Sequence, residues 1–496
     1  MLITGIDIGT TGCKCTIYRS SGELLSESYR EYQVEENTNE HQINPLTVWK
    51  NILVVLEEAS DKVDRIDAIG VSSFGETFVL LDEKDQPLMD SLLYTDPRGG
   101  KQCKKLIEEF GADYLNHSTG LNPNPMYSIS KLMWIKENKT EIYKKTKYIC
   151  LFQDFIVYKL SGVRQLDYSM ATRTMAFDIN NLEWNENIFN FAGIDKNKMS
   201  KLVPTGSKAG FIKKDLAEKL GINNDAEIVS CCHDQIAAAV GAGVNKNGMA
   251  VDGIGTVECI TPVFDKNIDK SVLYDGSYAI VPFLDNNFVT YAFSFTGGAL
   301  LKWYRDKLAY LETEAVKKEG RDPYTYFNNK IDISRPSSLL LLPHFSGAAT
   351  PYMDNDAKGA IVGLTTETTR YEIYQAIMEG ISFEMLLNIE ELERAGIEIE
   401  ELRATGGGAR SREWLQMKAD IYNKKIVSLG SAQAGTLGSI MLAGVVCGIY
   451  ENLEEANNIF LKTIDIYEPD PETHEKYQQN YRKYKKMYQA IKEILN

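Results

Sequence analysis

One short motif occurs twice in the chain, about half the chain length apart. The first copy, at 5–12, reads Gly-Ile-Asp-Ile-Gly-Thr-Thr-Gly, and the second, at 250–258, reads Ala-Val-Asp-Gly-Ile-Gly-Thr-Val-Glu. Gly255 follows Gly9 by 246 residues in a chain of 496. Alternating apolar and polar residues flank both copies, which predicts β-hairpins with turns rich in Gly and Thr. The repeat therefore predicts two similar α/β domains, 1–243 and 244–496, each opening with a hairpin.

Between and after the hairpins, strand-like and helical patterns alternate along the chain. This alternation is typical of layered α/β domains. From Glu472 onwards, aromatic and apolar residues recur at helical spacing, which predicts a packed terminal helix. The other predicted strands are 66–72, 77–81, 227–231, 289–295 and 339–342, and the other predicted helices are 46–59, 101–110, 130–137, 236–243, 371–395 and 411–422.

The composition argues against several classes of protein. The chain carries 54 Lys and Arg against 69 Asp and Glu, a net charge of −15, which disfavours binding to a nucleic-acid backbone. No apolar run reaches the roughly 20 residues of a membrane helix, and the N-terminus lacks the pattern of a secretory signal. The eight cysteines show no zinc-site spacing. We therefore expect a cytoplasmic protein with reduced thiols and neither a nucleic-acid nor a membrane partner.

The two hairpin turns indicate phosphate binding. Consecutive backbone N–H groups and threonine hydroxyls in the turn 9–11 form a concave nest that suits phosphate oxygens. Asp7 supplies a carboxylate where a Mg²⁺ ion bridging those phosphates needs a ligand or a water acceptor. A single turn of this kind is usually no more than a turn. Because a second one occurs at Gly255, we interpret the pair as two clamps on one polyphosphate.

The most suggestive single residue is Asp234, in the sequence Cys-Cys-His-Asp-Gln at 231–235. A strand pattern ends there and a helix of small residues begins. The helix N-terminus favours the ionised form of a carboxylate at pH 7. A carboxylate that accepts a hydrogen bond from a substrate hydroxyl must be in this form. Gln235 beside it is placed to bind a neighbouring hydroxyl. The alternative interpretation is that Asp234 only caps the helix.

Two further segments are candidates for ligand contacts. Glu76, in Ser-Ser-Phe-Gly-Glu-Thr at 72–77, and Asp96 both follow strand patterns, from which carboxylates can hold pairs of hydroxyl groups. The alternative is that both are ordinary turn residues. The glycines at 406–408 follow a strand and precede a helix, a nucleotide-binding layout that does not match the dinucleotide fingerprint.

Two longer patterns resemble the signatures of the FGGY carbohydrate kinases. The first runs from Met126 to Asn138, and the second from Gly359 to Glu379. With the short loops, the resemblance covers essentially the whole chain. It implies an α/β fold of two tandem actin-like (ribonuclease H-like) ATPase domains with a central cleft. It also implies ATP- and Mg²⁺-dependent phosphorylation of a small carbohydrate, and a homodimer as the family-level expectation.

The resemblance also implies roles for individual residues. The catalytic aspartate falls on Asp234 and the metal-binding carboxylate on Asp7, in agreement with the patterns above. The expected substrate contacts are Phe74, Gly75, Glu76, Asp96, Asp234 and Gln235, and the expected nucleotide contacts are Gly9, Thr10, Thr11, Lys14, Gly255, Thr256, Gly298, Gly407, Gly408, Ser411 and Arg412.

The substrate itself stays open. Glycerol kinases carry an Arg-Glu pair where this chain has Gly75 and Glu76, and a Tyr near the position of Met126. Xylulokinases carry Met-His-Gly where this chain has Ser-Phe-Gly at 73–75. We expect a ketose such as xylulose, or a related polyol or sugar acid, phosphorylated at a terminal hydroxyl, with the small Gly75 leaving room for a longer substrate. Glycerol or gluconate is the alternative, and a non-catalytic actin-like sugar sensor is a third.

Overall fold

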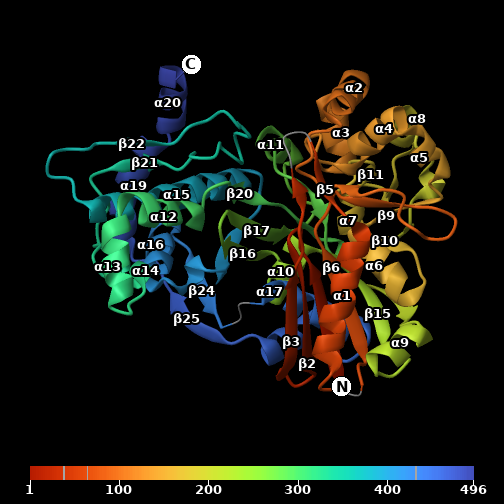
Figure 1. Ribbon diagram of the computed structural model, residues 1–496. Coiled ribbons are helices and arrows are strands. Elements are labelled where there is room, and N and C mark those ends of the chain that lie inside the picture. The colour runs from red at the N-terminus through yellow and green to blue at the C-terminus, as the bar shows by residue number, and fades with distance from the viewer. Residues whose placement is uncertain (37–39, 64, 431–432, 496) are drawn as a thin grey trace. The chain divides into compact units, whose positions relative to one another are not determined.

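The computed structural model describes residues 1–36, 40–63, 65–430 and 433–495, which form two compact α/β units (Figure 1). Unit 1 comprises Met1–Asn245, Ala279–Val289 and Gln433–Leu461. Unit 2 comprises the rest, beginning at Lys246. The first change of unit thus lies two residues from the predicted boundary at 243, but two later segments of the chain return to unit 1.

Unit 1 is built on a six-stranded mixed sheet in the order β14-β15-β6-β1-β2-β3. The first repeat motif forms the antiparallel hairpin β1–β2, and β1, β6 and β15 pair in parallel. Because parallel strands end at the same edge, Asp7, Ser73 and His233 come to one edge of the sheet. The strands are β1 (Leu2–Ile8), β2 (Gly12–Arg19), β3 (Leu24–Glu31), β6 (Ala68–Ser73), β14 (Ser207–Phe211) and β15 (Glu227–His233).

Helices cover this sheet, and the four helices predicted in this unit are present within two residues of their predicted bounds. Predicted strand 77–81 forms β7 (Phe78–Leu81), which pairs with β9 (Tyr148–Leu151) outside the main sheet. The principal helices of unit 1 are α1 (Pro45–Ser60), α2 (Gly100–Phe110), α4 (Ser128–Asn138), α6 (Phe152–Ser161), α7 (Tyr168–Thr172), α10 (Asp234–Gly241), α17 (Ala434–Val446) and α18 (Leu453–Phe460).

Helix α17 is the main element of unit 1 that the sequence did not place there. It packs against α10 and β1, and Figure 1 shows its blue ribbon among elements from the first half of the chain. A Cβ on Gly438 would lie 1.8 Å from the carbonyl oxygen of Ala237 in α10. A Cβ on Gly5 in β1 would lie 2.2 Å from the carbonyl oxygen of Thr436. Glycine therefore allows the backbones to meet directly.

Gly438→Ala is expected to destabilise unit 1 by about 1–3 kcal/mol, because the added methyl group forces α10 and α17 apart. Urea denaturation followed by circular dichroism measures the effect. Gly100→Ala is the matched control, since a Cβ there meets nothing within 4 Å at the start of a helix. A Gly438→Ala protein as stable as the control would contradict the close packing.

Unit 2 repeats the plan of unit 1. The second repeat motif forms the antiparallel hairpin β16–β17, and β16 pairs in parallel with β23, as β1 does with β6. The sheet continues through β24 to β25, and β20 pairs with β17. The strands are β16 (Gly248–Ile254), β17 (Glu258–Phe264), β20 (Ala292–Ser294), β23 (Ile399–Thr405), β24 (Lys425–Leu429) and β25 (Thr463–Tyr467).

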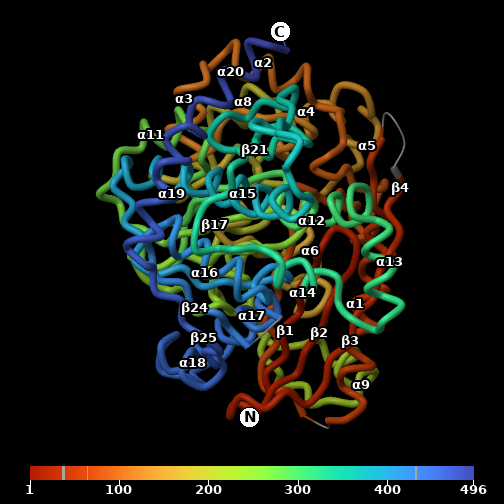
Figure 2. The backbone as a smooth tube through the Cα atoms, turned by 90° about the vertical axis from the view of Figure 1, so that its left-hand side faces the viewer, coloured from red at the N-terminus to blue at the C-terminus, as the bar shows by residue number. Residues whose placement is uncertain are grey.

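The second half of the second signature is helical. Its end lies at the start of α15 (Arg370–Arg394), where Thr369 and Glu372 form a capping box. Helices α16 and α19 pack side by side, as Figures 1 and 2 both show. The other bounds are α12 (Gly298–Trp303), α16 (Arg412–Tyr422), α19 (Pro471–Tyr484), α20 (Met487–Leu495), and strand β21 (Leu340–Leu342).

Two predicted elements differ from the structure. The strand expected at 289–295 is divided into β19 (Phe288–Val289) and β20, because the chain passes from unit 1 to unit 2 at Thr290. The single terminal helix is two helices, α19 and α20. Their tyrosines pack separately, since Tyr481 contacts Phe383 while Tyr488 stacks on Tyr352. Within the described residues, no helix has both the length and the apolar character needed to cross a bilayer.

Candidate functional site

The first hairpin presents Asp7 and Lys14 together. The two residues are direct partners in the β1–β2 register, so their side chains share one face of the hairpin. The Ser72 hydroxyl donates to Asp7 Oδ1 at 2.9 Å from the neighbouring strand β6. Burial raises the pKa of Asp7, and the Ser72 hydrogen bond and the Lys14 charge oppose that shift. Lys14 Nζ also lies 3.6 Å from Glu27 Oε2.

The turn of this hairpin is fixed by Tyr32, which the sequence did not single out. The Tyr32 hydroxyl donates to the Gly9 carbonyl and lies 3.1 Å from the Gly12 carbonyl, and its backbone N–H donates to the Thr11 carbonyl. Gly9 and Gly12 also close the turn with a backbone hydrogen bond of 2.9 Å. The side chain of Thr10 is half-buried and that of Thr11 is exposed. The predicted phosphate nest is therefore a rigid turn with hydroxyls at its surface.

Asp234 is the first residue of α10, directly after β15. The capping position belongs to His233, so the alternative interpretation of Asp234 as the helix cap is wrong. The carboxylate is 27% exposed, and Oδ1 lies 3.4 Å from Nε2 of His233. Burial, followed by the charges of Asp7 and Glu76, raises the pKa of Asp234 to about 8. In the free protein these effects oppose the ionisation that the helix N-terminus favours.

The two residues that flank Asp234 differ in burial: His233 is buried and Gln235 is exposed. Burial, and the nearby charge of Arg173, hold the pKa of His233 well below its usual range, so its ring is neutral. The backbone N–H of His233 donates to the Ser169 hydroxyl at 3.0 Å, which fixes the end of β15. Gln235 is exposed on the first turn of α10. Asp234 is thus the acidic group of this helix end, and Gln235 is accessible beside it.

Glu76 forms a buried ion pair with an arginine that the sequence reasoning missed. Arg173 Nε donates to Glu76 Oε1 at 2.6 Å, and the two side chains are only 9% and 5% exposed. The Arg173 guanidinium lies 5.2 Å from the ring centre of Tyr127. Glu76 also has a positive φ of 61°, which is costly for a residue other than glycine and concentrates at functional sites. No motif or spacing in the sequence indicates that residues 76 and 173 are in contact.

This ion pair corrects two expectations about the substrate. A Cβ on Gly75 would lie 2.8 Å from Cγ of Arg173, so the arginine occupies the room that the small glycine was expected to leave for a longer substrate. Glycerol kinases carry a guanidinium and a phenol at two positions where this chain has neither. In the structure, Arg173 and Tyr127 place these two groups beside Glu76. The departure at Gly75 therefore does not by itself disfavour glycerol.

Two other residues that were predicted to contact the substrate, Phe74 and Asp96, are buried. The Phe74 ring is 4% exposed and packs 5.0 Å from the Phe152 ring. The Asp96 carboxylate is inaccessible, and it accepts hydrogen bonds from the backbone of His41 and from the backbone and guanidinium of Arg98. The signature residue Lys131 donates to the Asp96 carbonyl at 2.6 Å. This arrangement favours a structural role for Asp96, and its proposed contact with substrate gains no support.

The second hairpin brings together three of the predicted nucleotide-binding positions. Gly255 and Thr256 are exposed in its turn. The backbone N–H of Gly298 donates to the Gly255 carbonyl at 2.8 Å, and those of Gly297 and Ala299 donate to the Thr256 carbonyl at 3.0 Å. The start of α12 is therefore bonded directly to the hairpin turn, although Gly298 follows Thr256 by 42 positions in the sequence.

The glycine loop 406–408 also lies against this hairpin. A Cβ on Gly406 would lie 2.7 Å from the carbonyl oxygen of Ile254, and one on Gly408 would lie 2.3 Å from the Ile254 side chain. A Cβ on Gly407 would meet nothing within 4 Å, so the backbone there is open to a ligand. Unit 2 thus gathers the predicted positions 255, 256, 298, 407 and 408 around one turn.

The last two predicted nucleotide contacts are already engaged. Ser411 caps α16, with its hydroxyl accepting from the Trp414 N–H at 3.1 Å and from the Asn328 amide at 2.9 Å. The Arg412 side chain is 74% exposed and lies 3.3 Å from an oxygen of Asp465 on β25. The cap positions the glycine loop, while a nucleotide contact by Ser411 or Arg412 stays a prediction.

The residues of unit 1 fit a magnesium ion held through few protein ligands. Among the described residues, no group of three His, Cys, Asp or Glu side chains is arranged to hold a metal. Mg²⁺ in phosphate-transfer sites usually takes one or two carboxylates, substrate phosphates and waters. A Cβ on Gly435, at the start of α17, would lie 2.4 Å from Asp7 Oδ2. Only glycine at this position keeps the second carboxylate oxygen clear.

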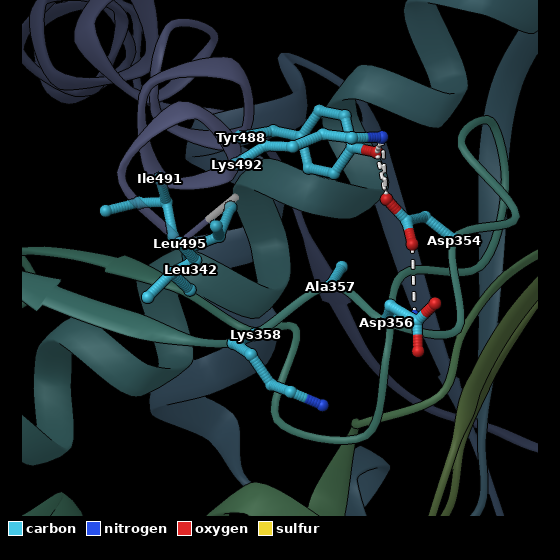
Figure 3. A pocket seen from close by; sticks show the side chains of 9 residues that line it. All are labelled: Leu342, Asp354, Asp356, Ala357, Lys358, Tyr488, Ile491, Lys492 and Leu495. Carbon is cyan, nitrogen blue, oxygen red and sulfur yellow. Dashed lines mark hydrogen bonds and ion pairs between the residues drawn. The ribbon is translucent and has the colours of Figure 1, made fainter.

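A cavity elsewhere in unit 2 contains none of the predicted site residues. It has a volume of about 210 Å³ and lies beside α20 (Figure 3). On one side, the Tyr488 hydroxyl and Lys492 Nζ both donate to Asp354 Oδ2, at 2.7 and 2.9 Å. Ile491 and Leu495 line another side. These contacts tie the terminal helix to its own unit.

Comparisons with known proteins agree with this organisation. Models of the N-terminal and C-terminal domains of the FGGY family of carbohydrate kinases match residues 2–241 and 282–447. A xylulose kinase of Bacillus subtilis is 28% identical over 99% of this chain and 97% of its own, and a glycerol kinase of Thermococcus gammatolerans is 29% identical over 96% and 95%. The crystal structure of a ligand-bound xylulose kinase from Lactobacillus acidophilus, 24% identical, has a TM-score of 0.89 over 99% of this chain and 98% of that one.

Proposed function

Because the chain belongs to the FGGY family of carbohydrate kinases, we propose that it transfers the terminal phosphoryl group of ATP to a terminal hydroxyl of a ketose such as xylulose, giving a sugar phosphate and ADP. The observation that carries the proposal is Asp234 at the start of α10. Its carboxylate is accessible, stands inside the helix rather than at its cap, and lies within the electrostatic influence of Asp7 and Glu76.

Asp234 is proposed to orient the acceptor hydroxyl and to receive its proton. Phosphoryl transfer has a loose transition state, so the main task of such a residue is positioning. The group must be ionised to act, and burial with two neighbouring carboxylates opposes ionisation in the free protein. A Mg²⁺ ion held at Asp7 would supply positive charge that offsets these carboxylates. Activity is therefore expected to rise with pH as Asp234 loses its proton.

Each hairpin is proposed to offer groups that bind phosphate or nucleotide. In unit 1, Thr10 and Thr11 offer backbone N–H groups and hydroxyls, and Lys14 offers a charge for the phosphates. In unit 2, the turn at Gly255 and the loop 406–408 offer exposed glycine backbone, which allows close approach of a ligand. These roles fit phosphate groups without requiring a basic protein, in keeping with the net charge of −15.

Asp7→Asn is expected to raise the Mg²⁺ concentration needed for half-maximal activity by about 10-fold or more, because an amide oxygen is a weaker ligand than a carboxylate. The measurement is the rate at saturating sugar and ATP over a Mg²⁺ titration. Ser72→Ala, which removes the hydroxyl that contacts Asp7 and the Ile6 carbonyl but keeps the Asp7 carboxylate, is the milder control. An unchanged Mg²⁺ dependence in Asp7→Asn would remove Asp7 from the proposed metal site.

Glycerol is the second candidate acceptor, and one observation favours it. Arg173 and Tyr127 place a guanidinium and a phenol beside Glu76, the group types that the glycerol-kinase pattern has in its acceptor site. ADP release measured across xylulose, ribulose, erythrulose, fuculose, gluconate, glycerol and common polyols separates the candidates by their kcat/KM values. Release that no member of the panel stimulates would favour the non-catalytic sensor instead.

A further inference from the structure

A lysine is fully buried in unit 2, next to the second hairpin, and makes contacts on both of its strands. Lys418 on α16 lies 3.2 Å from Asp252 Oδ2 on β16 and forms an ion pair with Glu258 on β17. It also donates to the Tyr422 hydroxyl at 2.9 Å. All four side chains are buried. The three donors of the ammonium group are therefore all used, and each strand of the hairpin is tied to the same helix.

The same helix reaches the glycine loop. Trp414, one turn before Lys418 on α16, is fully buried, and Lys418 Nζ lies 5.2 Å from the Trp414 ring centre. A Cβ on Gly408 would lie 3.0 Å from that ring. Helix α16 thus contacts the glycine loop through Trp414 and the flanks of the hairpin turn through Lys418.

We propose that Lys418 is a positioning residue for the nucleotide: it fixes the turn 255–257 relative to the loop 406–408 without touching the ligand. This inference rests on the proposed function, which gives both segments to ATP. A buried lysine is destabilising unless its partners offset the lost hydration. Here the partners stand at the two ends of one phosphate-binding turn, so the pairing fixes the turn as well as the fold.

The cluster holds one positive group against two carboxyl groups. Burial raises the pKa of both Asp252 and Glu258, and the nearby charge of Lys418 opposes that shift in each. The two acids therefore share one proton as a pair, beside the single positive charge of Lys418. The other groups facing this pair are Lys418 and Tyr422. Loss of that proton at high pH adds a negative charge directly after the turn, which opposes the binding of a triphosphate.

The first test is Lys418→Met, with binding of a non-hydrolysable ATP analogue measured by calorimetry at pH 7. We expect Kd to rise about 10-fold or more, as small displacements of positioning groups do, while the KM for sugar stays unchanged. Lys424→Met is the matched control, since Lys424 pairs with Glu393 at the end of α15 instead of with the hairpin. A folded Lys418→Met protein with the wild-type Kd would overturn the inference.

A second variant keeps the test decisive if Lys418→Met does not fold. Glu258→Gln retains the Lys418–Asp252 pair but cannot lose a proton. Between pH 7 and 9, Kd for the analogue is expected to rise in the wild type and to stay level in Glu258→Gln. Equal slopes in the two proteins would overturn the inference. Sugar-stimulated ADP release from the wild type tests the proposed function separately, so the two failures are distinguishable.

Discussion

Asp234→Asn is expected to lower kcat by about 10²–10⁴-fold, the usual contribution of a positioned acid or base. The amide keeps the shape of the side chain and can still contact the acceptor hydroxyl, but it cannot receive the proton. The KM for sugar is therefore expected to change much less than kcat. Initial rates at saturating ATP, over a range of sugar concentrations, separate the two constants.

The same substitution is expected to stabilise the protein at pH 8. The pKa of Asp234 is about 8 in the folded protein, above the value of 3.8 for an unperturbed aspartate. Between these values the folded protein holds a proton that the unfolded chain has lost, so the free energy of unfolding falls as pH rises. The asparagine variant does not titrate. With allowance for the partial exposure of the carboxylate, its advantage is expected to grow from nearly zero at pH 4 to about 2–4 kcal/mol at pH 8.

Activity and stability together distinguish a catalytic role of Asp234 from a purely stabilising effect of its charge. If the carboxylate only stabilised the N-terminus of α10, its loss would cost about 0.3–1 kcal/mol and leave turnover intact. Asp215, on the first turn of the surface helix 214–220, is the matched control for that effect. An Asp234→Asn protein that turned over like the wild type, or lost stability at pH 8 as Asp215→Asn does, would contradict the proposed role.

Arg173→Met is expected to cost about 3–5 kcal/mol of folding free energy, because it leaves the Glu76 carboxylate buried without its partner. The ion pair is among the least exposed in unit 1, with side chains 9% and 5% accessible. The loss of the guanidinium is also expected to raise the KM for sugar more than the KM for ATP. Urea denaturation measures the first effect, and steady-state rates measure the second.

The double variant Arg173→Met with Glu76→Gln separates charge from packing. Removing both charges is expected to recover most of the lost stability, because no isolated ion remains buried. Sugar affinity is expected to stay low, since the groups proposed to line the acceptor site are gone. A double variant no more stable than Arg173→Met would mean that packing of the arginine, rather than its charge, supports Glu76.

The sequence predicted those features that depend on local pattern. The two hairpins occur where the repeat placed them. Asp234 lies at the predicted junction of strand and helix, although the predicted helix began two residues later. Alternation, turn residues and helical spacing are properties of neighbouring residues, and so a single sequence reveals them.

The rest depends on contacts between distant parts of the chain. Helix α17 follows the glycine loop 406–408 in the sequence but packs on β1, and nothing in its small-residue pattern identifies that partner. Arg173 takes the space left by Gly75 across a separation of 98 residues. The ionisation of Asp234 depends on Asp7 and Glu76, whose nearness only the fold creates. Sequence reasoning therefore identified the groups but not the environment that sets their chemistry.

The most direct test of the central claim follows the terminal phosphoryl group of ATP. With isotopically labelled γ-phosphate and the preferred sugar of the panel, label is expected to appear in the sugar phosphate in a one-to-one ratio with ADP, and to disappear in Asp234→Asn. Recovery of the label as inorganic phosphate at the same rate with and without sugar would contradict the assignment of this protein as a carbohydrate kinase.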